Sequence, residues 1–233
     1  FIAAISNNDS VGDALDRGTF IAPLAAGPDG NGQYWSSEPA NEGNTVAGGG
    51  QYFYAVTTFE TADSIGLVVQ ADGTWDVWLN GRHLPGEPYG GGRNCQPRMP
   101  FQTQPGENTL VIRSRGGNTA TVTAATTHDA LYMNLADATT PHLVVGRQDD
   151  LYIGIATLNT TDEPIFSATA EIIDNDYFEA TSIIHPALGA GASSQVSWRL
   201  VQKQAIEAAD TQVEVTLRSV SYTHLTLPTM RTV

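Results

Sequence analysis

The sequence predicts an all-β protein made of two consecutive antiparallel β-sandwiches. Short runs of β-branched and aromatic residues recur along all 233 residues, which is the spacing of sandwiches and jelly rolls. The 23 glycines and 12 prolines supply turns between these runs. Helical periodicity is scarce, and it is confined to Ser10–Asp16, where Ser10 is the expected N-cap, and Gln202–Ala209.

The first domain is expected over residues 1–140, as a jelly roll. Its expected strands are Thr19–Leu24, Gln51–Glu60, Ser64–Ala71, Trp75–Leu79, Met99–Gln104, Asn108–Ser114 and Thr119–Ala125. The segment Leu131–Leu135 is a candidate for its final strand, inside the connection Thr126–Thr140. Turn-forming residues separate these strands, and Asn80-Gly81 is the strongest signal because a type I′ hairpin needs two residues with positive φ.

Two tryptophans flank this predicted hairpin. Side chains alternate across a strand, so Trp75 is expected on one face, with Val77 and Leu79. Trp78 is expected on the other face, with Asp76 and Asn80. Apolar residues on both faces indicate either a central strand covered on both sides or one that presents an aromatic ring to a ligand.

The second domain is expected over residues 141–219. Its expected strands are Leu143–Arg147, Leu151–Asn159, Ile165–Ile173, Phe178–Ile184, Ser194–Val201 and Thr211–Arg218. We expect this sandwich to be truncated, with an unpaired edge at its last strand.

The runs Tyr52–Glu60, Ser64–Val69, Val77–Gly81 and Pro105–Ile112 together resemble galactose-binding-domain-like β-sandwiches. Such modules are appended to many secreted glycoside hydrolases, esterases and peptidases. The resemblance covers roughly Gly18 to Ala125 and implies an Arg-bearing loop, with Arg93 or Arg98 as the arginine. This chain departs from the family pattern in the glycine-rich loop Tyr89–Pro100.

Two further resemblances concern the C-terminal part. Leu151–Asn159, Ser194–Leu200 and the Asn-x-Thr-x-x-Pro turn after Leu158 resemble a bacterial immunoglobulin-like domain. Val220–Thr229 resembles one reading frame of a transposon-end sequencing adapter, which would make residues 220–233 a translated tail; the alternative is a genuine final strand. We therefore expect a fragment of a longer gene, with parent-chain domains, and any leader, outside it.

Composition excludes several classes of function. The formal net charge of −14 argues against nucleic-acid binding, which needs clustered Lys and Arg. No apolar run approaches the ~18 residues of a membrane span. A single cysteine, Cys95, excludes an intrachain disulfide framework and a thiolate zinc site. Cys95 is either a reactive thiol activated by Arg93 and Arg98 or a partly buried bystander.

No catalytic signature is present. The sequence lacks the G-x-S-x-G elbow, the H-E-x-x-H zinc motif, the P-loop and the dinucleotide fingerprint. The histidines His83, His128, His142 and His185 have no metal-ligand spacing. No resident cofactor is expected, apart from a structural calcium. Its weak candidates are Asp174 and Asp176, which serve equally well as turn formers.

A glycan is the partner class expected. Proteins hold sugars on aromatic faces and fix the hydroxyls with polar side chains. The hairpin and its following loop gather the candidate ligand-binding residues, which are Trp78, Asn80, Arg82, His83, Tyr89 and Arg93. Alternatively, the tryptophans are core residues.

The sequence thus predicts no enzyme but a non-catalytic accessory module of a larger secreted protein, extracellular or on the cell surface. The module either binds carbohydrate or spaces a hydrolase domain that lies outside this chain. The alternative is a fragment of a cell-surface or adhesion protein whose sandwiches are purely structural.

Overall fold

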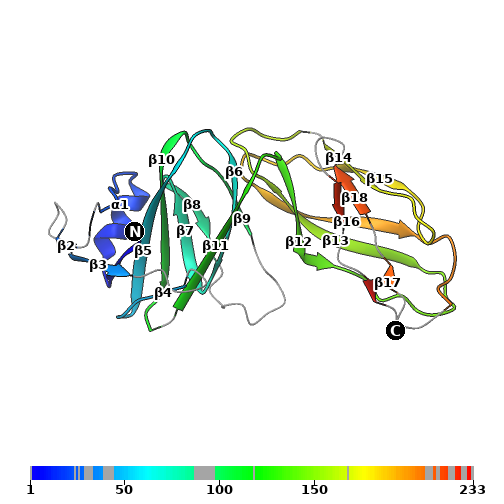
Figure 1. The fold of residues 1–233 in the computed structure, drawn as a ribbon, viewed down its shortest axis with the longest axis horizontal. Coiled ribbons are helices and arrows are strands. Elements are labelled where there is room, and N and C mark those ends of the chain that lie inside the picture. The colour runs from blue at the N-terminus through cyan, green and yellow to red at the C-terminus, as the bar shows by residue number, and fades with distance from the viewer. Residues whose placement is uncertain are drawn as a thin grey trace. The chain divides into compact units, whose positions relative to one another are not determined.

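A computed structural model describes most of the chain. The described residues are 2–23, 25, 27–28, 34–38, 45–86, 98–117, 119–166, 168–207, 212–213, 216–219, 224–226 and 230–231. The chain divides into two compact units, Phe1–Thr126 and Thr127–Val233, and each is built from antiparallel strands (Figure 1). This confirms the predicted all-β class of two consecutive sandwiches.

The described residues of the first unit form one helix, α1 (Asp9–Asp16), and two sheets. Its strands are β1 (Ile2–Ser6), β2 (Gly27–Pro28), β3 (Tyr34–Glu38), β4 (Thr45–Ala47), β5 (Tyr52–Thr61), β6 (Gly66–Asp72), β7 (Thr74–Leu79), β8 (Arg82–Pro85), β9 (Met99–Gln102), β10 (Gly106–Arg115) and β11 (Thr119–Thr127). The larger sheet has the order β2-β3-β1-β5-β10-β7-β8, and the smaller has the order β4-β11-β6-β9.

The core of the first unit lies between these two sheets. Alternate residues of β5, β7 and β10 face alternate residues of β6, β9 and β11, as the period of two requires. Phe53 and Val77 from the larger sheet and Val69 and Phe101 from the smaller sheet all belong to this apolar cluster, and none is more than 1% exposed. The core rigidly holds β5, β10 and β7, whose opposite face carries the candidate site.

Helix α1 covers part of that opposite, outer face (Figure 1). Val11 and Leu15 come one turn apart on the helix and pack with Tyr54, Trp78 and other outward-facing residues of the sheet. The helix begins two residues earlier than expected. Asn8, not Ser10, is the N-cap: its side-chain oxygen accepts a hydrogen bond from the Ser10 backbone N–H at 3.1 Å.

The hairpin predicted at Asn80-Gly81 is confirmed. Asn80 has φ 51° and Gly81 has φ 81°, the left-handed pair that a type I′ turn needs. The turn joins β7 to β8 in the register Leu79↔Arg82 and Trp78↔His83. The hairpin therefore brings His83 directly opposite Trp78.

In the second unit, the residues with a described structure form two facing sheets and a short strand pair. Its strands are β12 (Leu131–Thr139), β13 (Asp150–Asn159), β14 (Ala168–Ile172), β15 (Thr181–His185), β16 (Ser193–Val201), β17 (Gln212–Val213), β18 (Thr216–Ser219), β19 (His224–Thr226) and β20 (Met230–Arg231). The sheet orders are β12-β13-β16 and β15-β14-β18-β19, and β17 pairs with β20. Ile153, Ile155 and Trp198 of one sheet pack on Ala170 and Ile172 of the other.

Several elements differ from the prediction. β12 pairs with β13 in the second unit, so the strand expected to close the first domain opens the second, and the division falls at Thr126/Thr127. Thr19–Pro23 and Val144–Arg147 form no strand, and β1 was not expected. The described part of Gln202–Ala209, up to Glu207, is not helical. In the tail, β19 pairs with β18, and its adapter origin stays a prediction.

Candidate functional site

The outer face of β7, β8 and β10 carries aromatic and charged side chains side by side. Trp78 lies at its centre, but it is only 4% exposed. The His83 ring stacks on it, with centroids 4.8 Å apart and an interplanar angle of 23°, and Tyr54 contacts it at 6.2 Å. Because neighbours cover the ring, Trp78 cannot serve as the open stacking surface expected of it, and it belongs to the apolar cluster beneath α1.

Trp75 takes the exposed position instead. The register between β10 and β7 shifts at Arg113/Ser114, so Arg113 opposes Asp76 while Ser114 opposes Thr74. Trp75 is the extra residue of this β-bulge, and it leaves the core face on which alternation placed it. Its side chain is 37% exposed, and the Arg113 guanidinium lies 5.7 Å from its ring centroid.

Asp76 contacts two side chains, those of His83 and Arg113, at this face. The His83 Nε2 donates to one carboxylate oxygen at 2.7 Å, and Arg113 Nη2 lies 2.5 Å from the other. The Asp76 side chain is 13% exposed, whereas those of His83 and Arg113 are 47% and 38% exposed. The partly buried carboxylate thus holds two half-exposed side chains, His83 by a hydrogen bond and Arg113 by an ion pair.

Arg113 also donates a hydrogen bond to the Tyr54 hydroxyl, and this contact shows in two pKa values. Burial raises the pKa of Tyr54, although Arg113 opposes the shift. Desolvation acts to lower the pKa of Arg113, but the contacts with Tyr54 and Asp76 outweigh it and raise that pKa overall. Arg113 is therefore a permanent cation at this face.

Nearby, at the entrance to α1, Tyr52 donates a hydrogen bond to the Asp9 carboxylate. This bond, with burial and the Asp9 charge behind it, raises the pKa of Tyr52 to about 12. Tyr52 also packs edge-on against Tyr54, with ring centroids 5.9 Å apart. Polar and aromatic side chains therefore form a continuous strip from Asp9, in the first turn of α1, across Tyr52 and Tyr54 of β5 to Arg113.

Both polar atoms of the Asn80 side chain are used in hydrogen bonds to β10. Its Nδ2 donates to Asn108 Oδ1 at 2.8 Å, and its Oδ1 accepts from the Thr109 backbone N–H at 2.8 Å. Arg82 sets its guanidinium carbon 5.9 Å from the Phe101 ring centroid and is half-buried. Of the expected ligand-binding residues that the structure describes, only His83 contacts Asp76, the carboxylate that also contacts Arg113.

The other expected residues of this set, Tyr89 and Arg93, lie outside the described residues, as does Cys95. Their ligand-binding role and the reactivity of the thiol stay predictions. Sequence reasoning missed Trp75, Asp76 and Arg113 as members of the site. A pattern of alternation carries no signal for a bulge, and Arg113 lies in a strand with no motif around it that would mark it as a site residue.

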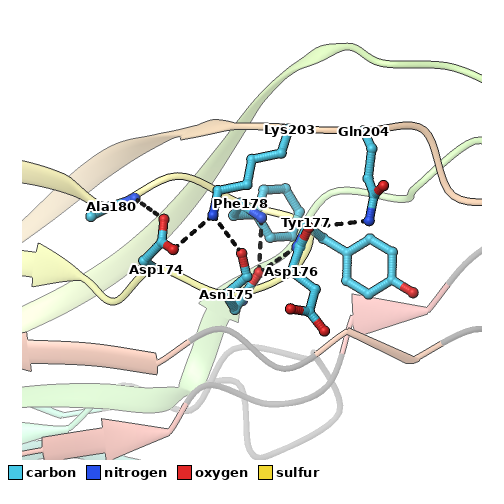
Figure 2. A network of polar contacts seen from close by, with 8 residues as sticks. All are labelled: Asp174, Asn175, Asp176, Tyr177, Phe178, Ala180, Lys203 and Gln204. Atoms are coloured by element: carbon cyan, nitrogen blue, oxygen red, sulfur yellow. Dashed lines mark hydrogen bonds and ion pairs between the residues drawn. The ribbon is translucent and has the colours of Figure 1, made fainter.

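The carboxylates proposed for calcium are engaged differently. Asp174 Oδ2 lies 2.7 Å from the Lys203 Nζ, and Asp174 Oδ1 accepts from the Ala180 backbone N–H at 3.2 Å. The Lys203 amino group also donates to the Asn175 carbonyl at 2.8 Å, and the Asp176 carboxylate points away from that of Asp174 (Figure 2). The lysine takes the position that a cation would occupy between these oxygens.

Among the residues that the structure describes, no group of three or more His, Cys, Asp or Glu side chains is arranged to hold a metal ion. No helix in the same part of the chain has the length and hydropathy needed to cross a membrane.

No family model matches the sequence, and no curated protein is similar to it at a significant level. Solved structures with partial likeness include the exo-chitosanase CsxA of Amycolatopsis orientalis, at 12% identity and a TM-score of 0.44 over 75% of this chain and 25% of that one. A glycosyl hydrolase family 2 member from Bacteroides cellulosilyticus is similar at 14% identity and a TM-score of 0.41, over 76% of this chain and 28% of that one. A β-glucuronidase of Bacteroides uniformis is similar at 14% identity and a TM-score of 0.38, over 76% of this chain and 26% of that one.

This chain therefore spans about a quarter of the length of these solved proteins. TM-scores below 0.5 do not establish a common fold, so the fold described above rests on the strand pairing of this chain alone.

Proposed function

We propose that this chain is a non-catalytic accessory part of a larger carbohydrate-active protein, and that its first unit binds a glycan at the outer face of β7, β8 and β10. The observation that carries the proposal is the half-exposed Trp75 ring beside three fixed polar side chains, Asp76, His83 and Arg113. The resemblance of the first domain to galactose-binding-like modules supports the same conclusion.

The chemistry of the cluster suits a sugar. The C–H face of a pyranose packs on an aromatic ring, and its hydroxyls need donors and acceptors at fixed positions. Trp75 supplies exposed ring surface, the Arg113 guanidinium over that ring supplies N–H donors, and the half-exposed His83 ring supplies a second polar group on the other side of Asp76. Their shared contact with Asp76 orients both donors before a ligand arrives, which lowers the entropic cost of binding.

The same geometry favours binding over hydrolysis. Both oxygens of Asp76 already contact a partner side chain, His83 on one and Arg113 on the other. Glycoside hydrolysis needs carboxyl groups that can reach the scissile bond. Because both of its oxygens are engaged by neighbours, Asp76 is suited to orienting those neighbours.

The test is retention on insoluble polysaccharides together with a glycan array. The proteins compared are the wild type, Trp75→Ala, and Tyr152→Ala as the matched control. Tyr152 is an exposed aromatic of the second unit, 58% exposed on β13. We expect Trp75→Ala to weaken binding by about fivefold or more, because stacking of this kind contributes ~1 kcal/mol or more. Tyr152→Ala should bind like the wild type.

Two results would contradict the proposal. One is a wild-type protein that no glycan retains. The other is a Trp75→Ala variant that binds as tightly as Tyr152→Ala does.

A further inference from the structure

We propose that the first unit also binds an uncharged apolar small molecule, an alkyl chain or an aromatic ring, in a cavity between its two sheets. The cavity has a volume of about 620 Å³. This volume lies within the roughly 300–1,000 Å³ typical of ligand pockets. The inference is independent of the glycan proposal, because the cavity opens on the inner face of the larger sheet and Trp75 lies on the outer face.

The floor of the cavity is the core of the unit. Leu67 from β6 and Leu110 and Ile112 from β10 form it, and they are 5%, 9% and 3% exposed. Phe59 from β5 and Val122 from β11 form walls, and both remain half-buried. Towards Thr126 the sandwich therefore opens into a hollow lined by apolar side chains.

The walls expose apolar surface that the unit does not cover itself. Val122, Ala124 and Thr126 line the cavity at a spacing of two, so one face of β11 points into it. Ala124 is exposed, although it faces the larger sheet across the hollow. An apolar ligand in this hollow would remove apolar surface from water on the walls and on itself, which is the driving force for binding in such pockets.

The charge of the lining selects the ligand. Among the described residues that line the cavity, the exposed Glu60 carboxylate is the single charged group, and there is no Lys, Arg or His. An anionic head group would find no cation there and would be repelled by Glu60 as well as by the overall charge of −14. The other polar groups of the lining are the hydroxyls of Thr57, Thr61 and Thr126, so an uncharged ligand is the class that fits.

Two matched fluorescent probes test the proposal on the full chain. N-phenylnaphthylamine is uncharged, and anilinonaphthalenesulfonate has the same ring system with an added sulfonate. We expect the uncharged probe to bind at one site per chain and at least about tenfold more tightly than the sulfonated probe.

A pair of substitutions locates the binding site. Ala124→Phe places a ring in the cavity, whereas Ala125→Phe places the same ring on the opposite face of β11. We expect Ala124→Phe to weaken binding of the uncharged probe by about tenfold or more and Ala125→Phe to leave it unchanged. Thr126→Phe, at the exposed rim, replaces Ala124→Phe if that variant does not show the cooperative unfolding of the wild type.

Three results would overturn the inference. They are no fluorescence increase with the uncharged probe, equal affinity for both probes, and an equal loss of binding in Ala124→Phe and Ala125→Phe. The Trp75→Ala variant separates the two proposals, because it should lose glycan binding and keep the probe.

Discussion

Replacing Asn108 with Ala should strongly destabilise the first unit. Asn108 is 0% exposed, and its amide makes five hydrogen-bond contacts. The Nδ2 donates to the Gln104 carbonyl at 2.9 Å, the Gly106 carbonyl at 3.0 Å and Thr61 Oγ1 at 3.1 Å. The Oδ1 accepts from the Gln104 N–H at 2.9 Å and from Asn80 Nδ2 at 2.8 Å. One side chain thus joins the β9–β10 connection, the end of β5 and the tip of the β7–β8 hairpin.

The magnitude follows from this contact set. Two amide hydrogens shared by three acceptors, with two accepted bonds, give the equivalent of about four hydrogen bonds at ~1 kcal/mol each. We therefore expect Asn108→Ala to lower the free energy of unfolding of this unit by about 4 kcal/mol, out of the ~5–15 kcal/mol of a typical domain. The Gln104 N–H, which is left without its partner, acts in the same direction.

The measurement is scanning calorimetry, in which each compact unit should give its own transition. Gln104→Ala is the matched control, because Gln104 meets Asn108 only through its backbone and its side chain is exposed. It should cost less than about 0.5 kcal/mol. If Asn108→Ala costs no more than this control, or if the transition of the other unit shifts instead, the reasoning is wrong.

Three further outcomes are expected. Replacing Asp9 with Asn should lower the pKa of Tyr52 from about 12 toward the ordinary 10.0, measured as tyrosinate absorbance. The Tyr52–Asp9 contact stabilises the fold fully below pH 10.0, and this stabilisation is lost as the pH rises toward about 12. A variant that titrates like the wild type would show that the contact is not formed. The hydrogen bond from Lys203 lowers the pKa of Asp174, so Lys203→Ala should raise that pKa toward its ordinary value in a carboxyl NMR titration. The contact stabilises the second unit above the ordinary carboxyl pKa, and this stabilisation is lost as the pH falls through the lowered pKa. A titration like that of the wild type would contradict this. Ending the chain after Ser219 removes β19, a three-residue strand at the edge of its sheet, and β20, the two-residue partner of β17, and should cost the second unit less than about 1 kcal/mol in a calorimetric scan. A larger loss would mean that residues 220–233 are an integral part of the sandwich.

The fold class and the hairpin could be predicted because their signals are local. Alternation identifies a strand from its own residues, and Asn80-Gly81 specifies a turn from two positions. The domain boundary could not be predicted in this way. Leu131–Thr139 has the pattern of a strand, but nothing within it states that its partner is β13 rather than a strand of the first unit.

The candidate site was harder to predict than the fold because it depends on register. The sequence favoured Trp78 and Asn80 for ligand contact, yet one is covered by His83 and the other bonds to Asn108 and Thr109. A single extra residue in β7 decides which tryptophan is exposed. His83 could be predicted because the two-residue turn fixes its position opposite Trp78.

The bulge at Trp75 separates the chemistry of the surface from the integrity of the sandwich. A bulged residue stands outside the pairing register, so its side chain is free of the packing demands that fix Val77 and Leu79. Substitutions at this position can therefore change the chemistry of the outer face while the fold persists.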